Sequence, residues 1–169
     1  MSHDINKIVD SVVKEILEVG ATQVKKPVRE PLRKMTLSAA KEIIQAVQKK
    51  AAEMGVKAVV AVSDAGGNVI AVECMDDAFI ASYDIAVNKA FTVVSLKMPT
   101  SKLAELASPG GSLYGIQFTN NGRIIIFGGG EPLKSGSAVL GGLGVSGGTA
   151  KEDTELGEYG REFFEKNFL

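Results

Sequence analysis

The chain has 169 residues, of which 45% are hydrophobic, and a formal net charge of −1. This length and composition fit one domain with a hydrophobic core and at most a short appendage. Because basic and acidic residues nearly balance, neither nucleic acid nor an anionic membrane is expected as a partner. The sequence contains no apolar run of transmembrane length and no signal-peptide core, so we expect a cytoplasmic location.

Residues 1–19 are predicted to form an amphipathic helix. Its apolar residues recur at steps of three and four, which gives one continuous face: Ile5, Ile8, Val9, Val12, Val13, Ile16 and Leu17. Residues 20–34 contain two prolines and five cations without periodicity, which predicts a linker. This layout resembles the encapsulation peptides of bacterial microcompartments. The alternative is a helix that packs on its own domain or on a neighbouring subunit.

Residues 35–169 are predicted to form the folded domain. Thr36 is a candidate N-cap of a helix with one apolar face, and Gly55 is a candidate C-cap. Two apolar runs, Ala58–Val62 and Val69–Val72, then predict a hairpin whose turn contains Asp64. An aspartate at the end of a strand usually accepts hydrogen bonds from turn amides, so we interpret Asp64 as structural, with a catalytic carboxylate as the alternative.

A second helix is predicted over Phe79–Leu96. Lys89 falls on its apolar face, so the buried ammonium needs a partner or a ligand. We expect Thr100 to cap a short helix that ends at Ala107. The single cysteine, Cys74, lies in an apolar strand pattern and is predicted to be a buried structural thiol.

The glycine-rich stretch from Ser112 to Thr149 is the centre of the predicted sheet. Its two apolar runs, Ile124–Phe127 and Ala138–Val145, are predicted strands, joined by a loop or wide hairpin over Glu131–Ser137. Thr149 and Glu152 have the spacing of a capping box and predict a last helix. Because hairpins outnumber crossovers in this order of elements, we expect a mainly antiparallel sheet with helices packed on it.

The motifs FGGGEPL and LGGLGVSGGTAKEDTELGEYG resemble the C-terminal signature of the GlcG/HbpS/PduO C-terminal domain family, a haem-binding-protein-like family. VVAVSDAGGNVIAVECMDDA resembles its first hairpin, and VNKAFTVVSLKMPT resembles the following helix. The resemblance covers about residues 35–164. It implies a profilin-like α/β fold with a central five-stranded sheet flanked by helices, a homo-oligomer, and a pocket for haem or a corrinoid such as cobalamin.

The resemblance also implies a ligand site where the predicted helix meets the glycine clusters. We assign to this site Lys89, Asn121, Arg123, Gly128, Gly129, Gly130, Gly147 and Gly148. Cationic and amide donors around an apolar floor suit a carboxylate-bearing ligand. The alternative is that Lys89 only pairs with Asp64 or with a backbone carbonyl.

Motifs for catalysis and metal binding are absent from the sequence. It has no P-loop, no dinucleotide-binding fingerprint and no zinc-type Cys/His spacing, and its single histidine is His3, in the predicted tail. We therefore nominate no catalytic and no metal-ligating residue. A haem iron would need an unusual ligand such as Tyr114, Met98 or Cys74, or a residue of a partner.

Three functions remain open. The first is a non-catalytic binding protein for a haem- or cobalamin-like cofactor in a microcompartment lumen, with shell or core proteins as partners of the N-terminal helix. The second is a small-molecule enzyme that uses Lys89, Asp64 and Arg123. The third is a purely structural or assembly protein of the lumen. The absence of a nucleophile–base pair favours the first.

Overall fold

The computed structural model describes residues 30–169. The elements run in the order helix α2 (Leu37–Glu53), strands β1 (Val59–Asp64) and β2 (Val69–Cys74), helices α3 (Ala81–Leu96) and α4 (Thr100–Ala107), 3-10 turns η1 (Ile116–Phe118) and η2 (Asn120–Gly122), strands β3 (Gly130–Ser135) and β4 (Ala138–Ser146), and helix α5 (Ala150–Phe168). Within this part of the chain, no helix combines the length and apolarity needed to cross a membrane. The predicted targeting residues lie outside the described residues.

The sheet is antiparallel throughout, with the strand order β2-β1-β4-β3. The predicted α/β class and antiparallel pairing are confirmed, but the described residues form four strands rather than five. The expected strand over Ile124–Phe127 is wrong: this segment has no strand pairing, and the Ile125 N–H donates instead to Thr92 Oγ1, 3.0 Å away. That the fold is profilin-like stays a prediction.

The fourth strand lies where the sequence predicted a loop. Gly130–Ser135 pairs with β4 and forms β3, although Pro132 lacks an N–H. A proline is tolerated here because β3 is at the edge of the sheet, so one side of the strand has no ladder to join. The tight turn into β4 uses Gly136, whose φ of +58° is open to glycine at little cost.

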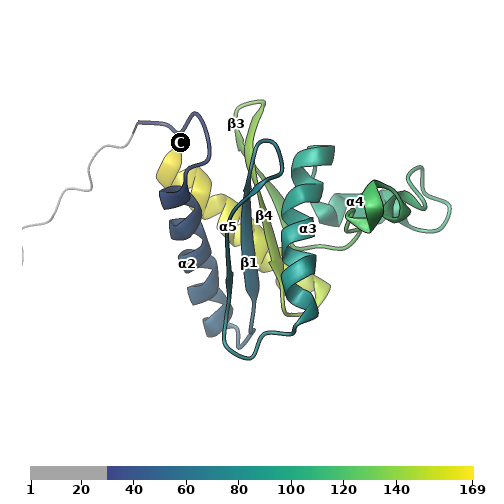
Figure 1. The fold of residues 1–169 in the computed structure, drawn as a ribbon, viewed down its shortest axis with the longest axis horizontal. Helices are drawn as coiled ribbons and strands as arrows, with labels where there is room; N and C mark the ends of the chain where they lie inside the picture. Colours follow the sequence, from purple (N-terminus) through teal and green to yellow (C-terminus); the bar gives the residue numbers. More distant parts are fainter. Residues whose placement is uncertain (1–29) are drawn as a thin grey trace, which may run out of the picture.

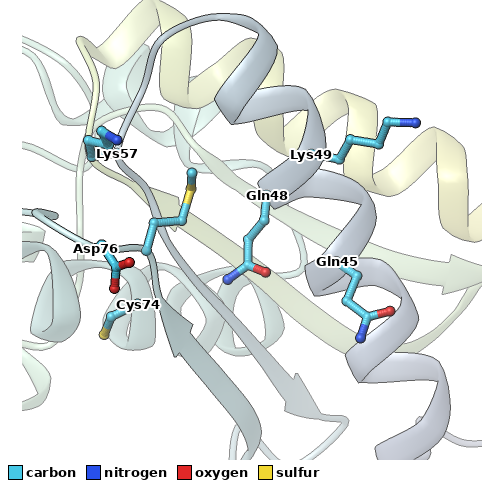
Figure 2. Close-up of a pocket in the computed structure, with 7 residues that line it drawn as sticks. Gln45, Gln48, Lys49, Lys57, Cys74 and Asp76 are labelled. Atoms are coloured by element: carbon cyan, nitrogen blue, oxygen red, sulfur yellow. The ribbon is translucent and has the colours of Figure 1, made fainter.

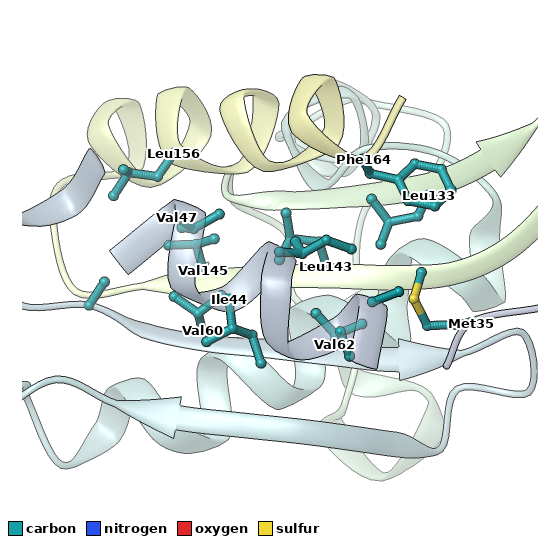
Figure 3. Close-up of a cluster of buried hydrophobic side chains, with 14 of the residues drawn as sticks. Met35, Ile44, Val47, Val60, Val62, Leu133, Leu143, Val145, Leu156 and Phe164 are labelled. Carbon is teal, nitrogen blue, oxygen red and sulfur yellow. The ribbon is translucent and has the colours of Figure 1, made fainter. Parts of the chain in front are cut away.

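The sheet separates two layers of helices. Helices α2 and α5 cover one face and α3 covers the other (Figure 1). Because side chains alternate along a strand, Val60 and Val62 of β1 join the larger core with α2 and α5, while Val59 and Ala61 face α3. Figure 3 shows this larger core, in which Leu143 of β4 lies between Val47 of α2 and Phe164 of α5.

Helix α3 lies unusually close to β4. A Cβ atom at Gly142 or Gly144 would collide with the backbone carbonyl oxygen of Ala90 or Ala86, respectively. The helix also presents small side chains to the sheet, since Ala86 and Ala90 are fully buried. Backbone therefore packs against backbone at this contact, which explains part of the glycine content of the predicted core strand.

The helix ends largely follow the sequence predictions. Thr36 Oγ1 accepts a hydrogen bond from the Ala39 N–H at 3.2 Å, and Gly55 follows the helix with a φ of +73°. The capping box of Thr149 and Glu152 is present. The prediction for Thr100 is wrong: it is the first residue of α4, and its buried hydroxyl accepts from the Gly130 N–H at 2.8 Å, which ties α4 to β3.

Candidate functional site

Lys89 is the largest fully buried side chain among the described residues. It lies on the face of α3 that meets the sheet, between the small residues that allow the close approach. Its ammonium donates hydrogen bonds to the Val145 carbonyl oxygen at 2.7 Å and to Asp153 Oδ2 at 2.8 Å. It also lies 4.8 Å from the centroid of the Phe127 ring. The polar end of the side chain is thus surrounded by protein groups.

The alternative prediction paired Lys89 with Asp64 or with a backbone carbonyl. The structure shows a carbonyl partner, Val145, but the carboxylate partner is Asp153 and not Asp64. Asp153 stands in the first turn of α5, where the positive end of the helix dipole favours a carboxylate. Its Oδ1 atom accepts from the Gly148 N–H at 2.9 Å. Burial lowers the pKa of the Lys89 ammonium, and the charge of Asp153 opposes this lowering. The pair joins α3, β4 and α5 in one buried contact.

Of the predicted glycines, Gly129 and Gly148 contact this pair, and atoms of the chain fill the space beside all five. At Gly129, a Cβ atom would lie 2.7 Å from Lys89 Nζ. At Gly130 it would lie 2.7 Å from Thr100 Cγ2, and at Gly148 it would lie 2.9 Å from the Glu152 side chain. A Cβ atom at Gly128 would collide with Thr154 Oγ1, and a Cβ atom at Gly147 would collide with the Lys57 carbonyl oxygen. These positions allow close internal packing, and their role in binding a ligand stays a prediction.

Arg123 follows η2 and lies half-buried against α3. Its Nε donates to Asn88 Oδ1 at 3.2 Å, and its guanidinium carbon lies 3.7 Å from the centroid of the Phe91 ring, within the range of a cation–π contact. The arginine thereby fastens the segment after η2 to α3. Asn121 is exposed in η2 and has a left-handed backbone with a φ of +56°.

Asp64 has the structural role that the sequence predicted. Its Oδ1 accepts from the N–H groups of Gly66 and Asn68, at 2.8 and 2.9 Å. The hydrogen bond from the Asn68 N–H lowers the pKa of the Asp64 carboxyl the most, and the bond from the Gly66 N–H adds to this lowering. In the described part of the chain, no hydrogen bond or ion pair joins Asp64, Lys89 and Arg123 to one another.

A cavity of about 550 Å³ lies between α2 and the end of β2. Figure 2 shows Gln48 directed from α2 toward Cys74 and Asp76, while Lys49 extends away from them. Cys74 is exposed as the last residue of an edge strand, so the prediction of a buried thiol is wrong. Two lysines and one aspartate line the cavity, and this mixture favours neither an anionic nor a cationic ligand.

Residues 30–169 contain no group of three His, Cys, Asp or Glu side chains placed to hold a metal ion.

Asp153 and Asn88 are the partners that the sequence reasoning missed. Asp153 is 64 residues from Lys89, and Asn88 is 35 residues from Arg123. One signal for Asp153 was available. An aspartate in the first turn of a helix is favoured by the positive end of the helix dipole, which marks Asp153 as a carboxylate that can stay charged when it is buried. No comparable signal singles out Asn88.

Comparison with known proteins gives a consistent assignment. The family model described as "Haem degrading protein HbpS-like" matches residues 35–162. A 15.0 kDa protein of Citrobacter freundii, from the dhaT-dhaS intergenic region, is 47% identical over 130 residues, which is 77% of this chain and 92% of that protein. The corrinoid adenosyltransferase PduO of Citrobacter freundii is 32% identical over 153 residues, 90% of this chain but 45% of PduO. The chain therefore spans less than half of PduO.

Solved structures show the same fold. Protein ORFY of Klebsiella pneumoniae superimposes with a TM-score of 0.76 at 43% identity, covering 83% of this chain and 97% of that one. The PduOC:heme complex superimposes with a TM-score of 0.73 at 30% identity, covering 76% of this chain and 94% of that one. Since the family model spans most of the described residues and close relatives match nearly end to end, the chain belongs to the HbpS-like family.

Proposed function

We propose that the protein is a non-catalytic binding protein for a tetrapyrrole-type cofactor, either haem or cobalamin. The observation that carries this proposal is the likeness to the PduOC:heme complex, at 30% identity and a TM-score of 0.73. A second relative is named a corrinoid adenosyltransferase, which keeps a cobalamin-like ligand beside haem. Both ligands combine an extended ring with polar side groups, so one apolar surface with a few donors can hold either.

The residues around Lys89 do not fit a haem in their present arrangement. The ammonium is fully buried and already bonded to Asp153 and Val145, so it offers nothing to a propionate. The one histidine of the sequence, His3, lies outside the described residues. Of the other candidate iron ligands, Tyr114 and Cys74 are exposed and Met98 is half-buried. The proposal therefore concerns binding, and it assigns no iron ligand and no chemical step.

Titration of the full chain with haemin and with cobalamin tests the binding proposal. We expect a saturable change of the Soret band or of the corrin bands for at least one of the two ligands, with one equivalent bound per chain. The change should survive gel filtration if the ligand is held as a cofactor. Spectra that equal the sum of free ligand and free protein for both ligands would contradict the proposal.

The enzyme alternative finds no support in the geometry, because its three polar groups point to separate partners: Lys89 to Asp153, Asp64 to its own turn, and Arg123 to Asn88. A structural or assembly role agrees with the buried Lys89–Asp153 pair, but it does not account for the likeness to the PduOC:heme complex. Homo-oligomer formation stays a prediction from the family resemblance.

We also propose a location in the lumen of a bacterial microcompartment, with shell or core proteins bound through residues 1–19. Support comes from the apolar stripe of these residues and from the kinship with PduO. A fusion of residues 1–19 to a fluorescent protein should co-localise with microcompartment shells. Ile8→Glu with Val12→Glu should disperse it, because two charges interrupt the apolar face.

The matched control for this experiment is Lys7→Glu with Lys14→Glu, which changes the polar face and should leave the localisation unchanged. A fusion that stays diffuse, or one that is unaffected by the change at Ile8 and Val12, would rule out the targeting role.

A further inference from the structure

A groove of about 660 Å³ lies at the end of the sheet where three segments meet. The start of α2, the β1–β2 turn and the β3–β4 hairpin all lie at this end, which is the upper end in Figure 1. The volume falls within the range of sites that hold small organic ligands. None of the residues assigned to the ligand site from the sequence lines this groove.

The floor of the groove is apolar. It is lined by Met35 and Leu37 at the start of α2, by Ile70 of β2, and by Val139 and Leu140 of β4. Leu37 is 54% exposed, although it is a large apolar side chain. Met35 has an unbranched, adaptable side chain that can follow the shape of a ligand. Such a floor gains free energy when an apolar body covers it.

The rim of the groove is cationic. Arg33 and Lys34 are both exposed and line it side by side. Among residues 30–169, neither has an ion-pair or hydrogen-bond partner. Asp64 is the acidic residue of the lining, and its carboxylate is already held by the amides of its own turn. Within the described part of the chain, the rim therefore offers two cations without a partner, and its carboxylate is already hydrogen-bonded.

We infer that this groove binds an amphipathic carboxylate, with the apolar body on the Leu37 and Val139 floor and the carboxylate at Arg33 and Lys34. The inference goes beyond the proposed tetrapyrrole binding and does not depend on it. Charge complementarity selects an anion over a neutral or cationic ligand, and the apolar floor selects an amphipathic molecule over a small inorganic anion.

Dodecanoate is the probe, titrated calorimetrically into the full chain. We expect saturable binding of one equivalent. Dodecyltrimethylammonium, which has the same alkyl chain and the opposite charge, should bind at least about tenfold more weakly, since charge-assisted hydrogen bonds replace repulsion. Arg33→Gln with Lys34→Gln should weaken dodecanoate roughly three- to tenfold. The control Lys102→Gln with Lys151→Gln, at exposed positions on other elements, should leave the affinity unchanged.

A second variant separates the floor from the rim. Leu37→Glu should weaken dodecanoate by about tenfold or more, because it places a charge on the apolar floor. A glutamate in the first turn of a helix is favourable, so this variant should keep the fold. The matched control is Ile80→Glu, at a residue that is 98% exposed and outside the groove.

Two outcomes would overturn the inference. One is dodecanoate binding that is equal in the groove variants and in their controls, which would place the carboxylate elsewhere. The other is no saturable binding by the wild type. If residues 1–29 fill the groove instead, the wild type should bind no dodecanoate, and Leu37→Glu should speed tryptic cleavage at Lys25 and Lys26. Haemin binding measured on the same variants reports on the tetrapyrrole proposal separately, since that proposal survives if the groove variants bind haemin normally.

Discussion

Asp153 and Glu131 are two buried carboxylates in the contact between α5 and the sheet, and they are held very differently. Asp153 is 2% exposed, with an ammonium at 2.8 Å and a backbone N–H at 2.9 Å. Glu131 is 4% exposed, and within residues 30–169 its ion pair is with Arg161, whose Nε lies 3.5 Å from Glu131 Oε2. That arginine is itself shared with Glu162 and Glu165.

The weaker compensation at Glu131 shows in its protonation. Burial raises the pKa of Glu131 to about 7, and Arg161 only partly offsets this rise, while Glu158 and Glu165 add to it. At Asp153, a dedicated ammonium and a helix N-terminus compensate the carboxylate. Equal burial therefore leads to different electrostatics, because the number and distance of the partners decide whether a charge is tolerated inside the protein.

Removing the ammonium from the better-compensated site should have the largest effect. Lys89→Met preserves most of the apolar volume but leaves the Asp153 carboxylate buried without its cation, so we expect a loss of roughly 3–5 kcal/mol in the free energy of unfolding. Urea unfolding at pH 7 measures this loss. Lys151→Met, at an exposed position in the same first turn of α5, should change stability by less than about 0.5 kcal/mol.

The same variant distinguishes the structural pair from the ligand site that the sequence predicted. If Lys89 holds a ligand, Lys89→Met should lose haemin or cobalamin binding and keep its unfolding midpoint. An unchanged midpoint would therefore show that the pair contributes little to the fold and would break the contrast with Glu131.

A smaller and pH-dependent effect is expected at Glu131. Its pKa is near 4.5 in the unfolded chain and about 7 in the fold, so between these values the unfolded chain releases its proton first. The free energy of unfolding should then fall as the pH rises from about 4.5 to 7, by up to roughly 3 kcal/mol. Glu131→Gln cannot ionise, so it should match the wild type near pH 4.5 and exceed it in stability at pH 8.

Urea unfolding of both proteins across this pH range measures the effect. Glu162→Gln is the matched control, since Glu162 also contacts Arg161, at 3.6 Å, but its side chain is 68% exposed. It should follow the wild-type pH profile. A wild-type stability that is constant from pH 5 to 8 would place the Glu131 pKa outside this range and remove the contrast between the two carboxylates.

Local sequence signals predicted the parts of the fold that depend on neighbouring residues. The cap at Thr36, the stop at Gly55, the Asp64 turn and the Thr149 capping box were all predicted, because each rests on hydrogen bonds between residues close in sequence. Strand β3 was not predicted because Pro132 indicates a loop in most contexts. A proline is compatible with a strand only at the edge of a sheet, and the sequence alone does not show that β3 lies there.

The candidate site was harder to predict because its contacts join distant segments. The burial of Lys89 followed from its helical face, but its partner did not, since Asp153 meets it only when α5 folds back across β4. Ile124–Phe127 has the composition of a strand, yet the Thr92 hydroxyl takes the place of a neighbouring strand. The groove at Arg33 combines three segments of the chain, and no local pattern brings them together.

The glycine contact between α3 and β4 has a consequence for sequence variation in this family. At Gly142 and Gly144 every other amino acid would place its first carbon against a backbone carbonyl, which cannot move as a side chain can. A deep mutational scan should therefore find these two positions intolerant to all replacements, including alanine. Gly136, which has open space around it, should instead be limited only by its backbone angle and accept asparagine or aspartate. Gly142 and Gly144 in β4 should therefore tolerate fewer substitutions than Gly136 in the turn before it.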